Sequence, residues 1–264
     1  MIVINSNENK NFKLCSQLAQ KKFRDKLGLY LIEGPNLLEE AVNSDADIKL
    51  VVFNEKMLPG VKKIWETGIY KGAEVFGMSE KLFEKLAQTE ASQGVLGVIK
   101  KNSKTQVEVE NGILSNAGNV IILDRLQDPG NIGTIIRTAE AAGYRGVVVL
   151  KGTADIYSPK VIRAAAGSVF RMPVLFFESP AQAMELLKKY GKKVVTTCFD
   201  TENNYYDIDL KKDIGLVIGN EGNGICRELI EGSDIRIKIP MTGIVESLNA
   251  AVAAGIVMFE AIRK

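Results

Sequence analysis

The chain has 264 residues, of which 46% are apolar and 25% charged, and its formal net charge is +2. This is ordinary globular composition for one large or two ordinary domains, and the net charge is too small to indicate a nucleic-acid partner by itself. The chain contains no histidine, which excludes histidine-based catalytic triads and histidine-ligated metals.

The first hundred residues alternate between helix and strand patterns. The expected elements are, in order, a helix, a strand, a helix, a strand, a helix and a strand at residues 11–28, 29–34, 35–44, 48–54, 79–88 and 93–100. Gly28 ends the first helix and Pro35 opens the second. These patterns predict a compact αβ domain over residues 1–106.

Residues 1–26 carry six cationic side chains against two carboxylates. In isolation, a solvated helix face explains such a cluster better than an arm that contacts phosphate groups. The strong periodicity is then lost between residues 101 and 117, where we expect a linker.

A second alternation occupies residues 118–264. Strands are expected at residues 119–124, 146–150, 173–177, 193–199, 214–219 and 234–239, and helices at residues 131–143, 158–167, 180–191 and 248–262. Strands rich in valine and isoleucine that alternate with helices predict a parallel sheet covered on both faces, so the fold class is α/β.

The last of these helices is apolar for about fifteen residues, shorter than the ~20 that a membrane span needs. No signal peptide is expected, because "MIVINSNENK" becomes polar early. Three cysteines are far apart and lack C-x-x-C spacing: Cys15, Cys198 and Cys226. We therefore expect a cytoplasmic protein without membrane contact, disulfides or a metal site.

Three loops that follow expected strands carry polar side chains, and open parallel sheets bind ligands at the carboxyl ends of their strands. "DRLQDPGNIGTIIR" contains Asn131 and Arg137, "IGNEGNG" contains Glu221, and "IPMTGIVESLNAA" contains Ser247 and Asn249. Each loop alone has a structural explanation, since glycine and asparagine form turns and serine and asparagine cap helices. Three such loops in order favour a functional site.

These three segments resemble the signature motifs of the SpoU, or TrmH-like, family of S-adenosylmethionine-dependent RNA 2'-O-ribose methyltransferases, in order and spacing, over residues 119–262. The stretches "KKFRDKLGLYLIEGPNLLEEA" and "TEASQGVLGVI" are similar to that family's RNA-binding domain, which resembles a ribosomal protein fold. The resemblance therefore covers nearly the whole chain.

The resemblance implies a C-terminal domain with a deep trefoil knot, S-adenosylmethionine as the cofactor, RNA as the substrate and a homodimer. The implied catalytic residues are Asn131, Arg137, Glu221, Ser247 and Asn249. The implied cofactor-binding residues are Gly219, Ile239 and Leu248. The expected phosphate contacts are Lys21, Lys22, Arg24 and Lys26.

Because a guanidinium stays protonated in proteins, we expect Arg137 to hold an RNA phosphate and stabilise the developing alkoxide, while a phosphate oxygen or water takes the proton. Asn131 and Glu221 are expected to orient Arg137. Ser247 and Asn249 are expected to cap the last helix and to bind the substrate or the knot loop.

Only RNA offers a ribose 2'-hydroxyl, and a separate binding domain favours a large folded RNA such as 23S ribosomal RNA, with transfer RNA as the alternative.

Two other classes of protein stay open. A non-catalytic RNA-binding relative would lack the five polar residues, and a nucleotide-dependent oxidoreductase would carry G-x-G-x-x-G, which "DRLQDPGNIG" does not supply. The helix at 248–262 is apolar nearly all round, which predicts that a partner covers part of it. The resemblance implies that this partner is a second subunit, so we expect a homodimer whose interface includes this helix and part of residues 131–143.

Overall fold

The computed structural model describes residues 2–57, 72–88, 92–101 and 106–263. The chain divides into two compact units, residues 1–103 with 157–163, and residues 104–156 with 164–264. Part of the quoted "TEASQGVLGVI" stretch, residues 89–91, lies outside the described residues.

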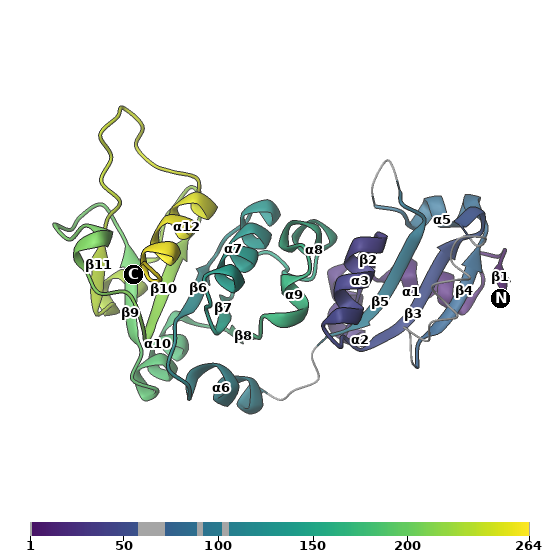
Figure 1. Ribbon diagram of the computed structural model, residues 1–264, viewed down its shortest axis with the longest axis horizontal. Helices are drawn as coiled ribbons and strands as arrows, with labels where there is room; N and C mark the ends of the chain where they lie inside the picture. The colour runs from purple at the N-terminus through teal and green to yellow at the C-terminus, as the bar shows by residue number, and fades with distance from the viewer. Residues whose placement is uncertain (1, 58–71, 89–91, 102–105, 264) are drawn as a thin grey trace. The chain divides into compact units, whose positions relative to one another are not determined.

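In its described residues, the first unit contains a five-stranded mixed sheet in the order β1-β4-β3-β5-β2 (Figure 1). Its strands are β1 (Val3–Ile4), β2 (Leu29–Glu33), β3 (Ile48–Asn54), β4 (Glu74–Met78) and β5 (Val95–Lys100). Its helices up to residue 88 are α1 (Lys10–Gln17), α2 (Lys21–Leu27), α3 (Pro35–Asn43), the 3-10 turn η1 (Glu55–Met57) and α5 (Glu80–Leu86). The strands β1, β4 and β3 run parallel, whereas β5 is antiparallel to β3 and β2.

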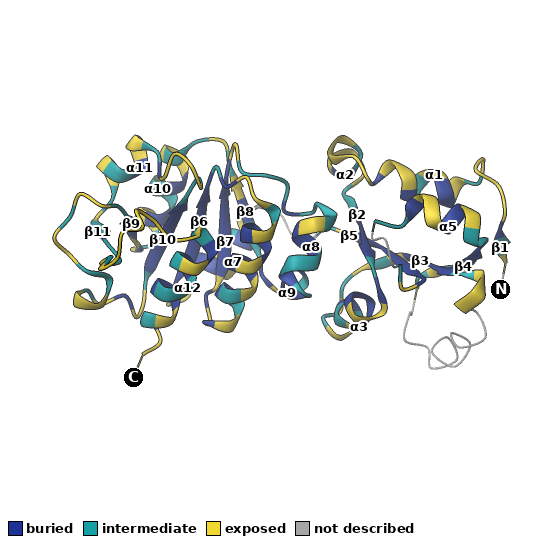
Figure 2. Cartoon of the chain, turned by 90° about the horizontal axis from the view of Figure 1, so that it is seen from above, coloured by how far each residue is buried: buried dark blue, intermediate teal, exposed yellow. Residues whose placement is uncertain are grey.

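The core of this unit lies between one face of the sheet and the helices α1 and α5. Phe12 and Cys15 of α1 and Phe83 of α5 pack with Val52 and Val98 of the central strands. Burial raises the pKa of the Cys15 thiol to about 12, so this cysteine is a core residue. Helix α3 covers the opposite face (Figure 2).

The expected single helix at residues 11–28 is two helices, α1 and α2, and the prediction of one helix is wrong. The chain turns between them without glycine or proline, and the buried Arg24 side chain explains how. Its Nη1 donates to the carbonyl oxygens of Leu18 at 2.7 Å and Ala19 at 2.8 Å. Arg24 thus satisfies carbonyl groups left open where α1 ends. Gly28, with φ +63°, ends α2 as expected.

The second unit is built on a six-stranded sheet in the order β11-β9-β10-β6-β7-β8, and every strand pairing in it is parallel. Its strands are β6 (Val120–Asp124), β7 (Gly146–Leu150), β8 (Val174–Phe177), β9 (Lys193–Thr197), β10 (Ile214–Gly219) and β11 (Ile235–Ile237). The prediction of an α/β fold with a parallel sheet is confirmed.

Helices cover both faces of this sheet (Figure 2). The helices of this unit are α6 (Gln106–Leu114), α7 (Pro129–Ala141), α9 (Ser168–Arg171), α10 (Pro180–Lys189), the 3-10 turn η2 (Tyr205–Asp207), α11 (Arg227–Gly232) and α12 (Ala250–Glu260). Most of α8 (Pro159–Ala165) is grouped with the first unit. Helices α6, α10 and α11 bury Ile113, Leu187 and Leu229 against one face. Helices α7 and α12 lie side by side over the other face.

Helix α6 lies within the stretch expected to be a linker. Its Val109, Ile113 and Leu114 are buried in the core of the second unit, so this segment is packed helix. The sequence signal is weak because the helix is short and contains Asn111 and Gly112, residues that disfavour a helix interior.

Candidate functional site

Two of the three polar loops begin at neighbouring strand ends. Gly219, the last residue of β10, is in register with Asp124, the last residue of β6. The loops that follow these strands therefore start side by side at the carboxyl edge of the sheet. The third loop follows β11 and leads into α12, which packs against α7.

Glu221 joins the second loop to the first. Its carboxylate accepts hydrogen bonds from the backbone nitrogens of Gln127 and Asp128, both at 3.0 Å, and from Nδ2 of Asn131 at 3.1 Å. Asp128 is the N-cap of α7 and accepts from the backbone nitrogen of Asn131 at 2.8 Å. Glu221 therefore places a negative charge at the positive end of α7, where the helix dipole favours it.

Asn249 extends the same chain of contacts to the third loop. Its Nδ2 donates to Oδ1 of Asn131 at 2.8 Å, and its Oδ1 accepts from the backbone nitrogens of Ala251 and Val252. The predicted cap on the last helix is confirmed for Asn249. It is wrong for Ser247, an exposed residue that makes no hydrogen bond to other described residues.

Glu221, Asn131 and Asn249 thus form a polar bridge that links all three loops. Partial burial alone would raise the pKa of the Glu221 carboxyl. The hydrogen bonds from the Gln127 backbone, the Asn131 side chain and the Asp128 backbone outweigh it, so the pKa lies below its usual value. The carboxylate is the form that this bridge stabilises.

The structure does not bring Arg137 into the bridge. Arg137 is exposed on α7 and makes no hydrogen bond or ion pair with any described residue. The expectation that Asn131 and Glu221 orient it is therefore wrong for this structure, because both side chains are engaged with the loops. The Arg137 guanidinium is free to meet a ligand from solvent.

The expected cofactor-binding residues lie at the strand ends and in the third loop. Gly219 admits no side chain, because an added Cβ would lie 2.3 Å from the backbone nitrogen of Ile225. Ile239 is half-buried and Leu248 exposed. Residues 239–248 make no hydrogen bond with other described residues, and Figure 1 shows this segment as a long loop extending away from its unit.

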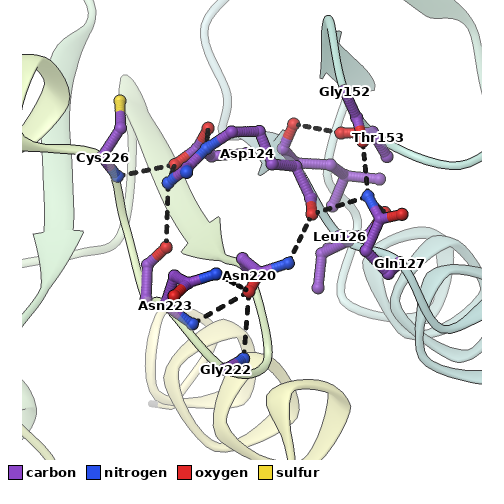
Figure 3. A network of polar contacts seen from close by, with 12 residues as sticks. Asp124, Leu126, Gln127, Gly152, Thr153, Asn220, Gly222, Asn223 and Cys226 are labelled. Carbon is purple, nitrogen blue, oxygen red and sulfur yellow. Dashed lines mark hydrogen bonds and ion pairs between the residues drawn. The ribbon is translucent and has the colours of Figure 1, made fainter.

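A second polar network was missed by the sequence analysis (Figure 3). Asp124, 1% exposed, binds Arg125 and the backbone of Cys226, and Nδ2 of Asn220 donates to the carbonyl oxygen of Arg125 at 2.9 Å. Asp124 ends a buried strand, and that position could have identified it from the sequence. The loop was instead interpreted through Asn131 and Arg137, which follow it.

The four expected RNA contacts do not share one environment. Lys21, Lys22 and Lys26 are exposed on α2, whereas Arg24 is buried. The burial of Arg24, with its bonds to Leu18 and Ala19, contradicts a phosphate-contacting role and assigns it to the connection between α1 and α2.

Within the described ranges, no cluster of three or more potential metal ligands occurs. No helix in those ranges is both long enough and apolar enough for a bilayer crossing.

An all-parallel sheet with polar loops that converge at its carboxyl edge defines an α/β protein whose ligand site lies at that edge. Comparison with known proteins gives the family. The model of the SpoU rRNA Methylase family matches residues 118–259, and that of the MRM3-like substrate binding domain matches residues 9–97. The chain belongs to the SpoU rRNA methylase family, as its motifs indicated.

Three relatives show how far the similarity extends. The chain is 37% identical over 257 residues to the 23S rRNA (guanosine(2553)-2'-O)-methyltransferase RlmP of Bacillus subtilis strain 168, covering 97% of each chain. It is 33% identical to the 23S rRNA (guanosine-2'-O-)-methyltransferase RlmB of Xanthomonas campestris pv. campestris, covering 88% of this chain and 96% of the relative. The AdoMet-bound rRNA methyltransferase from Sinorhizobium meliloti superposes with a TM-score of 0.86 at 32% identity, covering 98% of this chain and 96% of that chain.

Proposed function

We propose that this protein transfers a methyl group from S-adenosylmethionine (AdoMet) to a ribose 2'-hydroxyl of 23S ribosomal RNA. The observation that carries the proposal is the polar bridge of Asn131, Glu221 and Asn249, which ties the three family loops together at one sheet edge. The names of the two curated relatives support the ribosomal substrate, and both similarities extend over most of the chain.

The loops fit an adenosine cofactor. An added Cβ at Gly224 or Gly243 would meet no atom within 4 Å, so both glycines face open space. The main chain of residues 239–248 makes no hydrogen bond with other described residues, so its carbonyl and N–H groups are available to a ligand. We assign cofactor binding to Gly219, Ile239 and Leu248, mainly through their backbone. AdoMet, when bound, supplies a methyl group already activated by the sulfonium.

The protein's own residues then position RNA and manage one proton. Arg137 binds a phosphate next to the target nucleotide through its planar guanidinium and stabilises negative charge that develops on the 2'-oxygen. A phosphate oxygen or water accepts the proton. Asn131, Glu221 and Asn249 hold the loops in place, and the exposed Ser247 hydroxyl is available to bind the substrate.

The first unit is proposed to bind RNA through the lysines of α2. Lys21→Ala, Lys22→Ala and Lys26→Ala together should flatten the dependence of log K on log salt by roughly 0.7 to 0.9 for each lost contact. A matched control removes three exposed lysines of the second unit, Lys188, Lys189 and Lys193. An unchanged slope in the α2 variant, measured by filter binding to 23S RNA at several salt concentrations, would make this patch only a solvated face.

The assembly is proposed to be a cytoplasmic homodimer whose C-terminal segment is threaded into a trefoil knot. Exposed apolar side chains on α12 support the dimer, namely Val252 at 52%, Phe259 at 49% and Ile262, just beyond the helix, at 49%. Arg137 is exposed on α7, and α7 packs against α12, so a two-fold contact at α12 would bring each subunit's site close to its neighbour's.

The decisive experiment incubates the protein with methyl-labelled AdoMet and total RNA from a strain that lacks the gene. We expect label in 23S RNA, at a single ribose found by mapping the modified nucleotide. Label in transfer RNA would establish the alternative substrate, and RNA binding without transfer would identify a non-catalytic relative. Calorimetric titration with AdoMet and with NAD separates a methyltransferase from an oxidoreductase before any RNA is added.

A further inference from the structure

Asp124 is the most deeply buried carboxylate at the carboxyl edge of the sheet, and the proposed chemistry leaves it unused. Its Oδ1 lies 2.9 Å from Nε of Arg125, and its Oδ2 accepts from Nη2 of Arg125 at 3.0 Å and from the backbone nitrogen of Cys226 at 2.7 Å (Figure 3). Both carboxylate oxygens are thus engaged, and one of them binds a residue 102 positions further along the chain.

Arg125 continues this contact to the glycine-rich turn. Its Nη2 donates to the carbonyl oxygen of Gly224 at 3.2 Å, while its own carbonyl oxygen accepts from Nδ2 of Asn220 at 2.9 Å. Arg125 also has a φ of +57°, in the left-handed region that a side chain of this size rarely occupies. The surrounding contacts offset the strain of this conformation, which is typical of a position that function constrains.

The turn from Gly219 to Cys226 is closed on itself. The backbones of Asn220 and Gly224 exchange two hydrogen bonds, of 3.1 and 2.9 Å. Oδ1 of Asn220 accepts from the backbone nitrogens of Gly222 and Asn223. Asp124 and Arg125 hold this closed turn at three points: Asn220, Gly224 and Cys226.

We propose that Asp124 is a positioning residue for the cofactor, acting through Arg125 and the Cys226 backbone to hold the turn 219–226 in its binding conformation before AdoMet arrives. The inference rests on the proposed function. A binding site that is already ordered loses less conformational freedom when the ligand binds. Loss of Asp124 should therefore weaken cofactor affinity.

Asp124→Asn tests this at constant shape. Whichever way the amide is oriented, its NH2 group faces an N–H donor of Arg125 or Cys226, and the negative charge is lost. We expect the dissociation constant for AdoMet, measured by calorimetry without RNA, to rise tenfold or more. In the ligand-free protein, the backbone amide of Gly224 should exchange with solvent at least tenfold faster by mass spectrometry or NMR.

Asp213 provides a matched control at the opposite end of β10. Like Arg125, it has a left-handed φ, of +58°. Like that of Asp124, its carboxylate accepts a backbone N–H, from Gly118 at 3.1 Å, and pairs with a cation, Lys192, at 3.3 Å. Asp213→Asn should lower thermal stability yet leave AdoMet affinity within twofold of the wild type. Equal AdoMet affinity in the Asp124→Asn and Asp213→Asn variants would overturn the proposal.

A second variant covers the case in which Asp124→Asn does not fold. Arg125 is partly exposed, so Arg125→Ala removes the same link to Gly224 without changing a buried side chain. It should weaken AdoMet binding. The double variant, Asp124→Asn with Arg125→Ala, should bind AdoMet no more weakly than the single variant with the lower affinity. Unchanged affinity in Arg125→Ala would contradict the inference. A wild-type chain that does not bind AdoMet would overturn the cofactor assignment itself, before any variant is made.

Discussion

Among single residues, Arg137 distinguishes two mechanisms for removing the proton from the ribose 2'-hydroxyl. In one, Arg137 binds a phosphate and another group takes the proton; in the other, residue 137 itself takes it. Arg137 is exposed and unpaired among the described residues, so its charge is available to a phosphate. Arg137→Lys keeps a cation but loses the planar fork that binds phosphate in two places. We expect methyl transfer to fall about 100-fold or more, in line with the loss of one transition-state donor, with AdoMet affinity unchanged. Single-turnover rates against pH provide the measurement. Full activity with a pH optimum that follows lysine would make residue 137 the proton acceptor.

Glu221 is expected to make the folding stability of the protein fall at acidic pH. Because its folded-state pKa lies below the usual value near 4.5, the carboxylate contributes stability that is fully present above that value. The contribution is lost as pH falls through the lowered folded-state pKa. Glu221→Gln should therefore unfold at lower urea than the wild type at pH 7, and the difference should shrink below about pH 4.5. A difference that is constant from pH 7 to pH 3.5 would show that Glu221 is not held as a carboxylate.

At the scale of elements, α12 depends on Asn249 for both its cap and its link to α7. Asn249→Ala removes both and should cost about 1 kcal/mol from the cap alone. Asn249→Asp keeps an oxygen for the helix nitrogens but places a carboxylate against Oδ1 of Asn131. We expect it to retain more stability than Asn249→Ala and to lose methyl transfer as severely. Ser247→Ala is the control and should leave thermal stability unchanged, since Ser247 is not a cap.

The elements also show how far sequence reasoning extends. Buried strands such as β6 and β10 were predictable because short, continuous runs of apolar residues rich in valine and isoleucine indicate strands of a parallel sheet. The break between α1 and α2 was not, because it depends on a tertiary contact of Arg24 with the carbonyl groups of Leu18 and Ala19. A basic residue among lysines gives no sign that it is buried. Strand β4 was not predicted from the sequence, because Glu74 and Gly77 interrupt its apolar pattern.

The residues that make up the site were easier to predict from the sequence than the hydrogen bonds between them. Asn131, Glu221 and Asn249 are far apart in the sequence, and only the parallel sheet brings their loops together. The motif order indicated that they act together, but it gave no means of telling that Arg137 stands apart from them. Hydrogen-bond partners depend on side-chain directions, which residue spacing alone does not determine.

At the scale of the whole molecule, the exposure of α12 sharpens the prediction of a homodimer. The helix was expected to need a partner because it is apolar nearly all round. Within one chain, Val257 and Met258 are fully buried, whereas Val252 and Phe259 are about half exposed. Of these four side chains, Val252 and Phe259 are the ones available to another subunit, so a test at Val257 would report on folding.

Val252→Glu and Phe259→Glu should therefore give a folded monomer, because each places a charge where a dimer would bury it without a partner. Val257→Glu should fail to fold. Phe176→Glu, on the edge strand β8, changes a phenylalanine of similar exposure, 51%, and should remain dimeric. Sedimentation velocity measures the assembly, and labelled-AdoMet transfer measures activity, which we expect to disappear with the dimer. If the Phe259→Glu monomer methylates RNA at the wild-type rate, each chain has a complete site of its own and the face of α12 serves some other contact.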